Sequence, residues 1–316
     1  MKNNRMSISI FLLIILSVIG CSAYGMLNQG KEDDYISVSV IINDSSNARW
    51  DAFRAGVEQG AEDYHVHLNL VSTGNFRNAQ EERVIVNREL DGDADGIIVA
   101  PYSSEADMTL PAEPAKPVVL VGTGIETDKL FTTVMTNHAK LGEALAEAAI
   151  EDKAVKIGIL SGNQIQKSME QRLKSVKKRL ADAGVEISWV LSEKELNKKL
   201  RNIEYFTEHP VDTVISIDNA STEKAVDIML NNDSISWKLY GGGRSEKLVY
   251  YLDKGLIQVL AVPNEYYIGY QCVALAAQNI RYYTGETEQS EIDFYMVSKE
   301  NLYDEEISRI LFPTVR

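Results

Sequence analysis

Short apolar runs rich in Val and Ile alternate with segments of helical periodicity, and this alternation restricts the fold more than any other feature of the chain. Continuous runs of roughly four to eight apolar residues are typical of strands buried on both faces, and strands separated by helices form parallel sheets. In the first half we expect strands at 36–42, 67–71, 96–100 and 117–121, with helices at 49–64 and 78–90.

The same pattern begins again near residue 156. In this second half we expect strands at 156–160, 186–191, 213–217, 237–241 and 257–261, with helices at 167–183, 195–208 and 222–231. Two successive open sheets predict an α/β protein with two doubly wound parallel-sheet lobes. In such folds the ligand lies in the crevice at the carboxyl ends of the strands.

The first residues have the pattern of a secretory signal segment, because Lys2 and Arg5 precede an apolar stretch at 8–20. The stretch ends at Cys21 in a sequence that resembles a bacterial lipobox, with Val18 in place of the usual leucine. We therefore expect a signal and lipobox segment at 1–21, lipidation of Cys21 and a tether at 22–35. The alternative is an uncleaved anchor, because 8–27 approaches the length of a membrane span. Both place the folded part outside the cytoplasmic membrane and anchor it to the membrane's outer face.

Charge and cysteine content argue against two classes of function. The chain has 32 basic and 46 acidic residues, a net charge of −14. A surface this acidic repels phosphate backbones, so no nucleic-acid partner is expected. The two cysteines, Cys21 and Cys272, are too far apart for a disulfide framework or a metal-ligand spacing. Cys272 lies among small apolar residues, and we expect an inert core thiol there.

Several short segments follow one another in a characteristic order along residues 36–297. They are 47–50, 95–99, 103–104, 117–121, 136–142, 161–162 with Arg172, 217–219 and 268–269. In this order they resemble the type I periplasmic binding proteins, in the ribose- and galactose-binding branch that also supplies the ligand domains of LacI-like repressors. No helix-turn-helix precedes the module, and the signal segment argues further against a repressor.

The resemblance implies two lobes joined by a three-stranded hinge, the periplasmic-binding-protein-like I fold. Lobe 1 would comprise about 36–135 and 264–291, and lobe 2 about 136–263 and 292–316. The chain would cross between the lobes near Thr136, Pro263 and Ile292.

The resemblance also implies where a ligand would bind. Residues expected to face one another across the cleft are Asn47, Trp50, Asn137, Arg172 and Asn219, with Arg49, Asp218, Gly243 and Arg244 on its rim. This chemistry suits a sugar, because an indole covers the apolar face of a pyranose while amides and a guanidinium pair with its hydroxyls. The alternatives are that Trp50 is a core residue and that Arg172 is a surface charge on its helix.

The chain departs from the family's sugar-binding pattern at three places. Gly122 and Thr123 stand where an Asp-Arg pair is usual, Gly243 stands where an aspartate is usual, and Arg49 replaces an aromatic residue. Arg244, Asp218 and Glu170 are charged residues near enough in the pattern to compensate. The identity of the ligand therefore stays open.

Other chemistry finds little support in the sequence. His65 and His67 lie two residues apart without a readable third ligand, so no metal site is predicted. The glycines at 122–124 and 241–243 lack the residues that complete a dinucleotide or phosphate loop. No credible catalytic triad appears, so we expect no enzyme and no cofactor.

Two functions remain in competition. The first is a solute-binding protein that closes around a small polar ligand, a sugar or sugar derivative, and delivers it to an ABC importer. The second is a ligand sensor that presents its closed form to a membrane histidine kinase or chemoreceptor. The chain's own residues do not separate them.

Overall fold

The computed structural model describes residues 35–45, 50–105, 110–111, 114–125, 131–201, 203–282 and 287–312. Contacts between residues divide the chain into a unit at 1–36 and a unit at 37–316, and the second unit holds the sheets described below. Among the described residues, no helix is both long and apolar enough to cross a membrane.

The first sheet has the strand order β11-β5-β4-β3-β1-β2, and the pairs from β1 to β11 are parallel. Its strands are β1 (Ile36–Ile41), β2 (Val66–Leu70), β3 (Gly96–Val99), β4 (Val118–Val121), β5 (Thr132–Thr136) and β11 (Gln289–Ile292). The helices that follow its strands are α2 (Asp51–Asp63) and α3 (Ala79–Asp91), and α11 (Glu265–Tyr282) packs against α2 and the sheet. Every residue of β3 and β4 is buried, as expected of strands covered on both faces.

The second sheet has the order β12-β10-β9-β8-β6-β7 and is parallel except for β12, which pairs antiparallel with β10. Its strands are β6 (Lys156–Leu160), β7 (Glu186–Leu191), β8 (Thr213–Ser216), β9 (Lys238–Gly242), β10 (Ile257–Pro263) and β12 (Phe294–Ser298). Its helices are α5 (His138–Glu151), α6 (Lys167–Asp182), α7 (Glu193–Lys199), α8 (Glu204–Glu208), α9 (Asn219–Leu230), α10 (Glu246–Asp253) and α12 (Glu305–Leu311). The predicted α/β class with two doubly wound, mainly parallel sheets is thereby confirmed.

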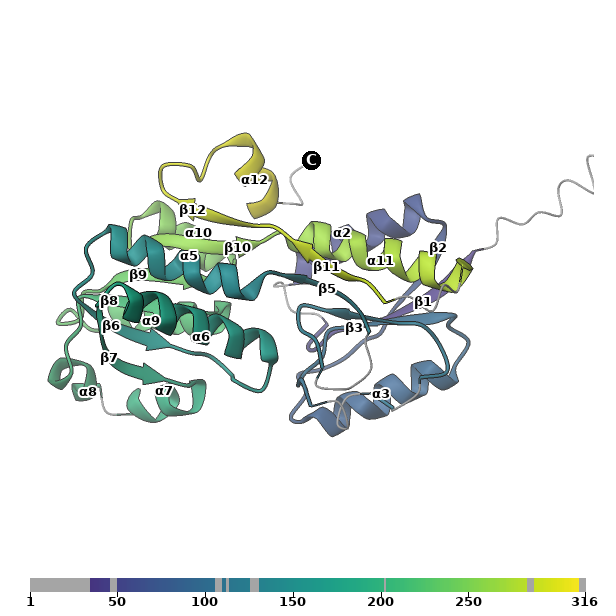
Figure 1. Cartoon of the computed structure of the whole chain (residues 1–316), viewed down its shortest axis with the longest axis horizontal. Helices are drawn as coiled ribbons and strands as arrows, with labels where there is room; N and C mark the ends of the chain where they lie inside the picture. The colour runs from purple at the N-terminus through teal and green to yellow at the C-terminus, as the bar shows by residue number, and fades with distance from the viewer. Residues whose placement is uncertain are drawn as a thin grey trace, which may run out of the picture. The chain divides into compact units, whose positions relative to one another are not determined.

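The chain passes between the two sheets three times, as can be followed in Figure 1: from β5 to α5, from β10 to α11 and from β11 to β12. Below, lobe 1 means the first sheet with α2, α3 and α11, and lobe 2 means the second sheet with α5–α10 and α12. Two contacts tie the crossing segments together: Asn137 Nδ2 donates to Glu291 Oε2 at 2.9 Å, and Asn264 N donates to the Asp293 carbonyl at 3.3 Å. The lobe boundaries expected from the sequence stay a prediction.

The structure differs from the predicted elements in a few places. The predicted helix at 195–208 is two helices, α7 and α8, because a capping box of Ser192 and Glu195 starts α7 early and α8 begins anew at Glu204. Phe206 in α8 packs edge-on against Trp189 and Trp237. His65 has a positive φ of 50° and lies before β2, so His65 and His67 do not share one strand face.

Two glycines let helices pack closely enough to position the site. A Cβ on Gly56 of α2 would lie 1.8 Å from the Tyr266 carbonyl oxygen of α11, so the two backbones touch. A Cβ on Gly142 of α5 would lie 2.4 Å from the Arg172 carbonyl oxygen of α6. The second contact holds the backbone of Arg172 directly against α5.

Candidate functional site

Five charged side chains near the carboxyl ends of strands and the starts of helices act on one another electrostatically. They are Asp51, Arg172, Asp218, Arg244 and Glu265, contributed by α2, α6, the β8–α9 turn, the β9–α10 turn and α11. Asp218 and Glu265 act on Arg172, and Glu265 and Asp51 act on Arg244. Cations and carboxylates therefore gather in one region supplied by both lobes, where this fold places its ligands.

Arg172 is the buried centre of this group, with 7% of its surface exposed. Its Nη1 donates to the Ile217 carbonyl at 2.8 Å, and its Nε donates to His138 Nδ1 at 3.1 Å. Burial lowers the pKa of Arg172 to about 10, while Asp218 and Glu265 act in the opposite direction. The alternative that Arg172 is a surface charge on its helix is wrong, and part of the guanidinium is engaged within the protein.

His138 connects Arg172 to lobe 1. Its Nε2 donates to the Gly122 carbonyl, which follows β4, while its Nδ1 accepts from Arg172. Burial, followed by the charge of Arg172, lowers the pKa of His138 to about 3. The ring is therefore neutral with its proton on Nε2, and it fixes the orientation of Arg172.

Asp218 and Asn219 begin α9, directly after β8. Asp218 caps the helix by accepting from Ser221 N at 2.7 Å. Asn219 Nδ2 donates to Glu223 at 3.0 Å, but Asn219 Oδ1 is buried and has no hydrogen-bond partner. Among the described residues the only other buried side-chain atom of this kind is Thr136 Oγ1.

Two glycines in left-handed conformations make room for these side chains. A Cβ on Gly162, at φ 59°, would lie 1.8 Å from Asp218 Oδ2. A Cβ on Gly243, at φ 105°, would lie 2.6 Å from the Cβ of Asn219. Packing therefore explains why residue 243 is a glycine, because Asn219 fills the space that a larger side chain there would need.

Trp50 and Asn137 are both engaged by protein partners. The half-buried Trp50 donates from Nε1 to the Asn43 carbonyl at 2.8 Å and packs edge-on against Phe53 with ring centres 5.6 Å apart. Asn137 caps α5 by accepting from Lys140 N at 2.9 Å, and its amide nitrogen donates to Glu291. Both ends of the Asn137 amide are thus hydrogen-bonded at the hinge.

Arg244 is half-buried, and its Nε donates to the Leu311 carbonyl at 2.7 Å. Burial lowers its pKa, and nearby carboxylates act in the opposite direction. Three of the predicted residues, Arg172, Asp218 and Arg244, therefore share one electrostatic environment. Asn47, Arg49 and Cys21 lie outside the described residues.

Sequence reasoning missed Asp51 and Glu265 as members of this group. Asp51 directly follows Trp50, and Glu265 is the first residue of the helix that returns to lobe 1 after the crossing at Pro263. Both are carboxylates at the starts of helices that follow strands. A search for charge at every such position would have found them.

A second group of polar residues, which the sequence did not indicate as contacts between the lobes, lies where lobe 1 meets the start of α6. Ser104 N donates to the Ile165 carbonyl at 3.0 Å, and Gln166 Nε2 donates to the Pro101 carbonyl at 2.7 Å. Thr123 Oγ1 accepts from Ser168 N at 3.2 Å. Thr123, which stands where the family's pattern has a ligand-bridging residue, thus bonds to the other lobe.

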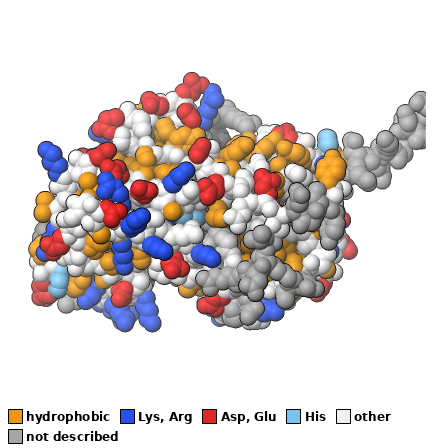
Figure 2. Space-filling model, viewed as in Figure 1, with side chains coloured by type: hydrophobic (Ala, Val, Ile, Leu, Met, Phe, Trp, Pro, Cys, Tyr) orange, Lys and Arg blue, Asp and Glu red, His pale blue; other side chains and the backbone are white. Residues whose placement is uncertain are grey.

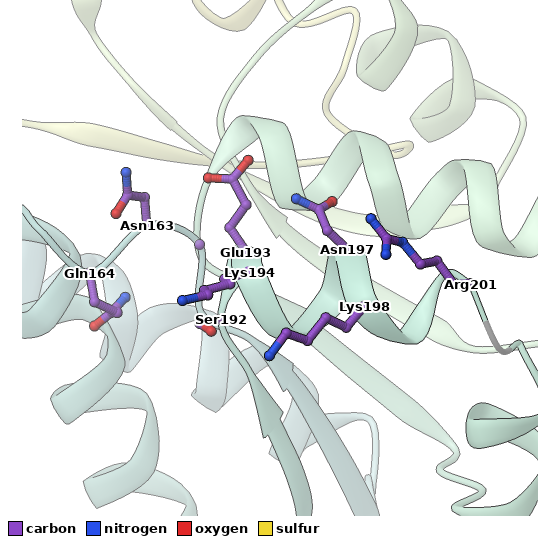
Figure 3. A pocket seen from close by; sticks show the side chains of 9 residues that line it. Asn163, Gln164, Ser192, Glu193, Lys194, Asn197, Lys198 and Arg201 are labelled. Atoms are coloured by element: carbon purple, nitrogen blue, oxygen red, sulfur yellow. The ribbon is translucent and has the colours of Figure 1, made fainter. Parts of the chain in front are cut away.

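A cavity of about 530 Å³ opens within lobe 2 at the carboxyl ends of β6 and β7. Figure 3 shows Lys194 and Lys198 extending from α7 toward the side on which Asn163 and Gln164 lie. Its other lining residues are Gly162, Ser192, Glu193, Asn197 and Arg201. None of the predicted ligand residues lines it. Figure 2 shows that Lys and Arg side chains also gather over neighbouring α6, so basic charge on this lobe is not confined to the cavity.

The described residues contain no group of three or more His, Cys, Asp or Glu side chains arranged to hold a metal ion. The thiol of Cys272 is buried, and burial raises its pKa. It is therefore a core residue that takes no part in the site.

Comparison with known proteins places this geometry in context. Residues 38–286 match the family model described as periplasmic binding protein domain. A search of curated proteins finds no match.

Several solved structures share the fold. A carbohydrate transporter solute-binding protein from Agrobacterium radiobacter, in complex with D-arabinose, is 15% identical with a TM-score of 0.76, covering 88% of this chain and 99% of that one. GanP, a glucose-galactose binding protein from Geobacillus stearothermophilus, is 16% identical with a TM-score of 0.74, covering 85% and 99%. A chain of the XylFII-LytSN complex is 15% identical with a TM-score of 0.71, covering 84% and 98%.

Proposed function

Because the chain belongs to the periplasmic binding protein family, we propose that it captures a small polyhydroxylated ligand, a sugar or sugar derivative, and delivers it unchanged to an ABC importer. Family membership implies a location outside the cytoplasm. Two structural matches are named as sugar-binding or carbohydrate-transporter proteins, which supports a sugar as the ligand class.

The observation that carries this proposal is a buried acceptor within a region of mixed charge. Asn219 Oδ1 has no partner, and a buried acceptor left unpaired costs free energy that a ligand hydroxyl can recover. Asp218, which directly precedes Asn219 in the chain, acts electrostatically on Arg172. A neutral ligand with several hydroxyls can pair with cations, carboxylates and amides together, whereas an ion would be repelled by one of the two charges.

Binding would proceed by closure about the three crossing segments. Such hinges absorb backbone rotation in a few residues while each lobe moves as a body. The Asn137–Glu291 bond joins the first crossing to the third, so the crossing segments would move together. Closure would bring Trp50 and Asp51 of lobe 1 toward Arg172, Asp218 and Arg244 of lobe 2.

We further propose that Cys21 carries a lipid that tethers the protein to the outer face of the cell membrane, with an uncleaved N-terminal segment as the alternative anchor. Support comes from the basic start, the apolar stretch and the small residues around Cys21. In either case the binding module would stay close to its membrane partner.

A second candidate function is that of a sensor whose closed form is presented to a membrane histidine kinase or chemoreceptor. One structural match is a chain in the XylFII-LytSN complex, which favours considering a protein partner of this kind. Neighbouring genes for a permease and an ATPase would support transport, and genes for a kinase and a regulator would support sensing.

The ligand class is tested by a thermal-shift screen of the full chain with sugars, polyols, nucleosides and sugar acids. A ligand that binds the folded state raises its unfolding temperature.

The ligand that raises it most is then titrated by calorimetry into wild type, Trp50→Ala and a control variant, Tyr250→Ala, which removes an exposed aromatic ring of α10. Loss of an indole that covers a sugar ring should cost about 1–3 kcal/mol in binding. Wild-type affinity in Trp50→Ala, or a response confined to non-sugar compounds, would contradict the proposal.

A further inference from the structure

Helix α6 lacks an N-terminal cap from its own segment. Its N-cap residue, Gln166, makes no side-chain capping bond and donates instead to the Pro101 carbonyl of lobe 1. The first backbone N–H groups of a helix have no partner within the helix, so they need an acceptor from elsewhere. In α3, α5, α7, α9 and α10 that acceptor is the helix's own N-cap side chain.

Lobe 1 supplies the missing acceptors. Ser104 Oγ accepts from Lys167 N at 2.8 Å, and Thr123 Oγ1 accepts from Ser168 N at 3.2 Å. The following amide is satisfied locally, because Met169 N donates to the Gln166 carbonyl at 3.0 Å. Two of the N–H groups at the start of a lobe 2 helix thus depend on hydroxyls from the other lobe.

Two further hydrogen bonds of Ser104 strengthen this contact between lobe 1 and the start of α6, and its residues are buried from water. Ser104 N donates to the Ile165 carbonyl at 3.0 Å, and Ser104 Oγ can donate to the Gly124 carbonyl at 2.7 Å. Ser104, Thr123 and Ser168 are each at most 4% exposed. A dry contact of this kind holds best when every polar group in it is paired.

We propose that Ser104 and Thr123 are positioning residues that latch the two lobes together at the start of α6. Separating the lobes removes this cap of α6, so the two hydroxyls favour the closed arrangement over the open one. The importance of this closed state for binding rests on the proposed function, but the latch itself does not.

The proposed latch predicts how fast particular backbone amides exchange their hydrogens with water. The amides of Ser104 and Lys167 bond across the lobes and are expected to exchange when the lobes part. Ser104 N is the cleaner reporter of separation, because Ser104 Oγ, which accepts from Lys167 N, also lies 3.2 Å from Thr123 Oγ1. Thr123→Val keeps the side-chain shape and removes one cap. Loss of a cap of this kind should raise the open population about fivefold, and exchange at Ser104 and Lys167 by the same factor.

The experiment is residue-resolved hydrogen exchange on the ligand-free full chain, comparing wild type with Thr123→Val and Ser245→Ala. Ser245 is a matched control, because its hydroxyl caps α10 within its own lobe by accepting from Leu248 N at 3.3 Å. We expect Ser245→Ala to speed exchange at Leu248 and to leave Ser104 and Lys167 unchanged. We expect Thr123→Val to speed exchange at Ser104 and Lys167 and to leave exchange at Leu248 unchanged.

Two outcomes would overturn the latch. One is unprotected exchange at Ser104 and Lys167 in the ligand-free wild type, which would mean that the lobes stand apart without ligand. The other is that Thr123→Val speeds exchange only at Ser168, which would make its hydroxyl a local cap with no effect on closure. Because neither measurement needs a ligand, failure of the latch and failure of the sugar-binding proposal are distinguishable.

Discussion

Replacing Glu82 by Gln should reverse the sign of its effect on stability between acidic and alkaline pH. Glu82 lies in α3 with no exposed surface, and both of its carboxylate oxygens lie 3.0 Å from the amide nitrogen of Tyr102. Burial raises the pKa of Glu82 from 4.5 to about 7, although the bond from Tyr102 acts in the opposite direction. Tyr102 directly precedes Ser103 and Ser104, so this carboxyl also supports the loop that meets α6.

The magnitude follows from the two pKa values. The folded state holds the proton up to about pH 7, whereas the unfolded chain releases it near pH 4.5. The contribution of Glu82 to stability is therefore fully present below pH 4.5 and is lost as the pH rises through 7. At about 1.4 kcal/mol per pH unit, the loss amounts to about 3 kcal/mol.

The Gln variant is free of this titration but buries an amide nitrogen, which costs about 1–2 kcal/mol if it finds no acceptor. We therefore expect the variant to be about 1–2 kcal/mol less stable than wild type at pH 4 and about 1–2 kcal/mol more stable at pH 8.5. Urea unfolding followed by tryptophan fluorescence at several pH values measures both free energies, and their difference cancels the titration of all other groups.

Glu81→Gln is the matched control, because the neighbouring Glu81 is only half-buried and bonds from Arg77 lower its pKa. Its difference from wild type should change with pH in the opposite direction. A stability difference for Glu82→Gln that is the same at every pH would refute the reasoning.

Three further predictions concern other groups. Asn219→Ala removes a buried acceptor that has no partner together with the bond to Glu223, so it should weaken ligand binding by calorimetry with little net change in unfolding temperature; a much lower unfolding temperature with unchanged affinity would contradict this. His138 has a pKa of about 3 in the folded protein against 6.5 unfolded, so the stability of wild type relative to His138→Gln should fall by about 1.4 kcal/mol per pH unit as the pH drops from 6.5 toward 3. Equal slopes in both proteins would show that this ring titrates normally. Cys21→Ala should abolish labelling by a fatty-acid probe and leave an uncleaved precursor, whereas unchanged labelling would favour the anchor.

The sequence predicted the strands that are buried on both faces, because burial demands continuous apolar residues. β3 and β4, which are Gly-Ile-Ile-Val and Val-Val-Leu-Val, are of this kind. It did not predict β5 or β11, whose sequences are Thr-Thr-Val-Met-Thr and Gln-Ser-Glu-Ile. β11 is an edge strand and β5 is its neighbour, so their pairing depends on the sheet more than on their own hydrophobicity.

The sequence could predict which residues lie at the candidate site, but it could not predict which groups those residues bond to. The resemblance led to Arg172, Asp218 and Arg244, and the rule that ligands gather at the carboxyl ends of strands agrees with Asp218 and Arg244. Neither could show that His138 bonds Arg172 on one side and Gly122 on the other, because these residues come from different elements. The identity of a polar residue states what it can bond, and only the fold decides which group it meets.

The polar residues near the crossing segments illustrate why this limit has a physical cause. An amide or hydroxyl that the resemblance assigns to a ligand can equally be used to hold the lobes, and the choice depends on groups far away in sequence. Asn137 reaches Glu291, 154 residues away, and Ser104 reaches the amide of Lys167, 63 residues away. Thr123 stands at a position where the family's pattern has a ligand-bridging residue, yet its hydroxyl is used between the lobes. If the proposed latch holds, these hydroxyls supply part of the free energy of closure, and fewer ligand contacts are then needed where the family's Asp-Arg pair is absent.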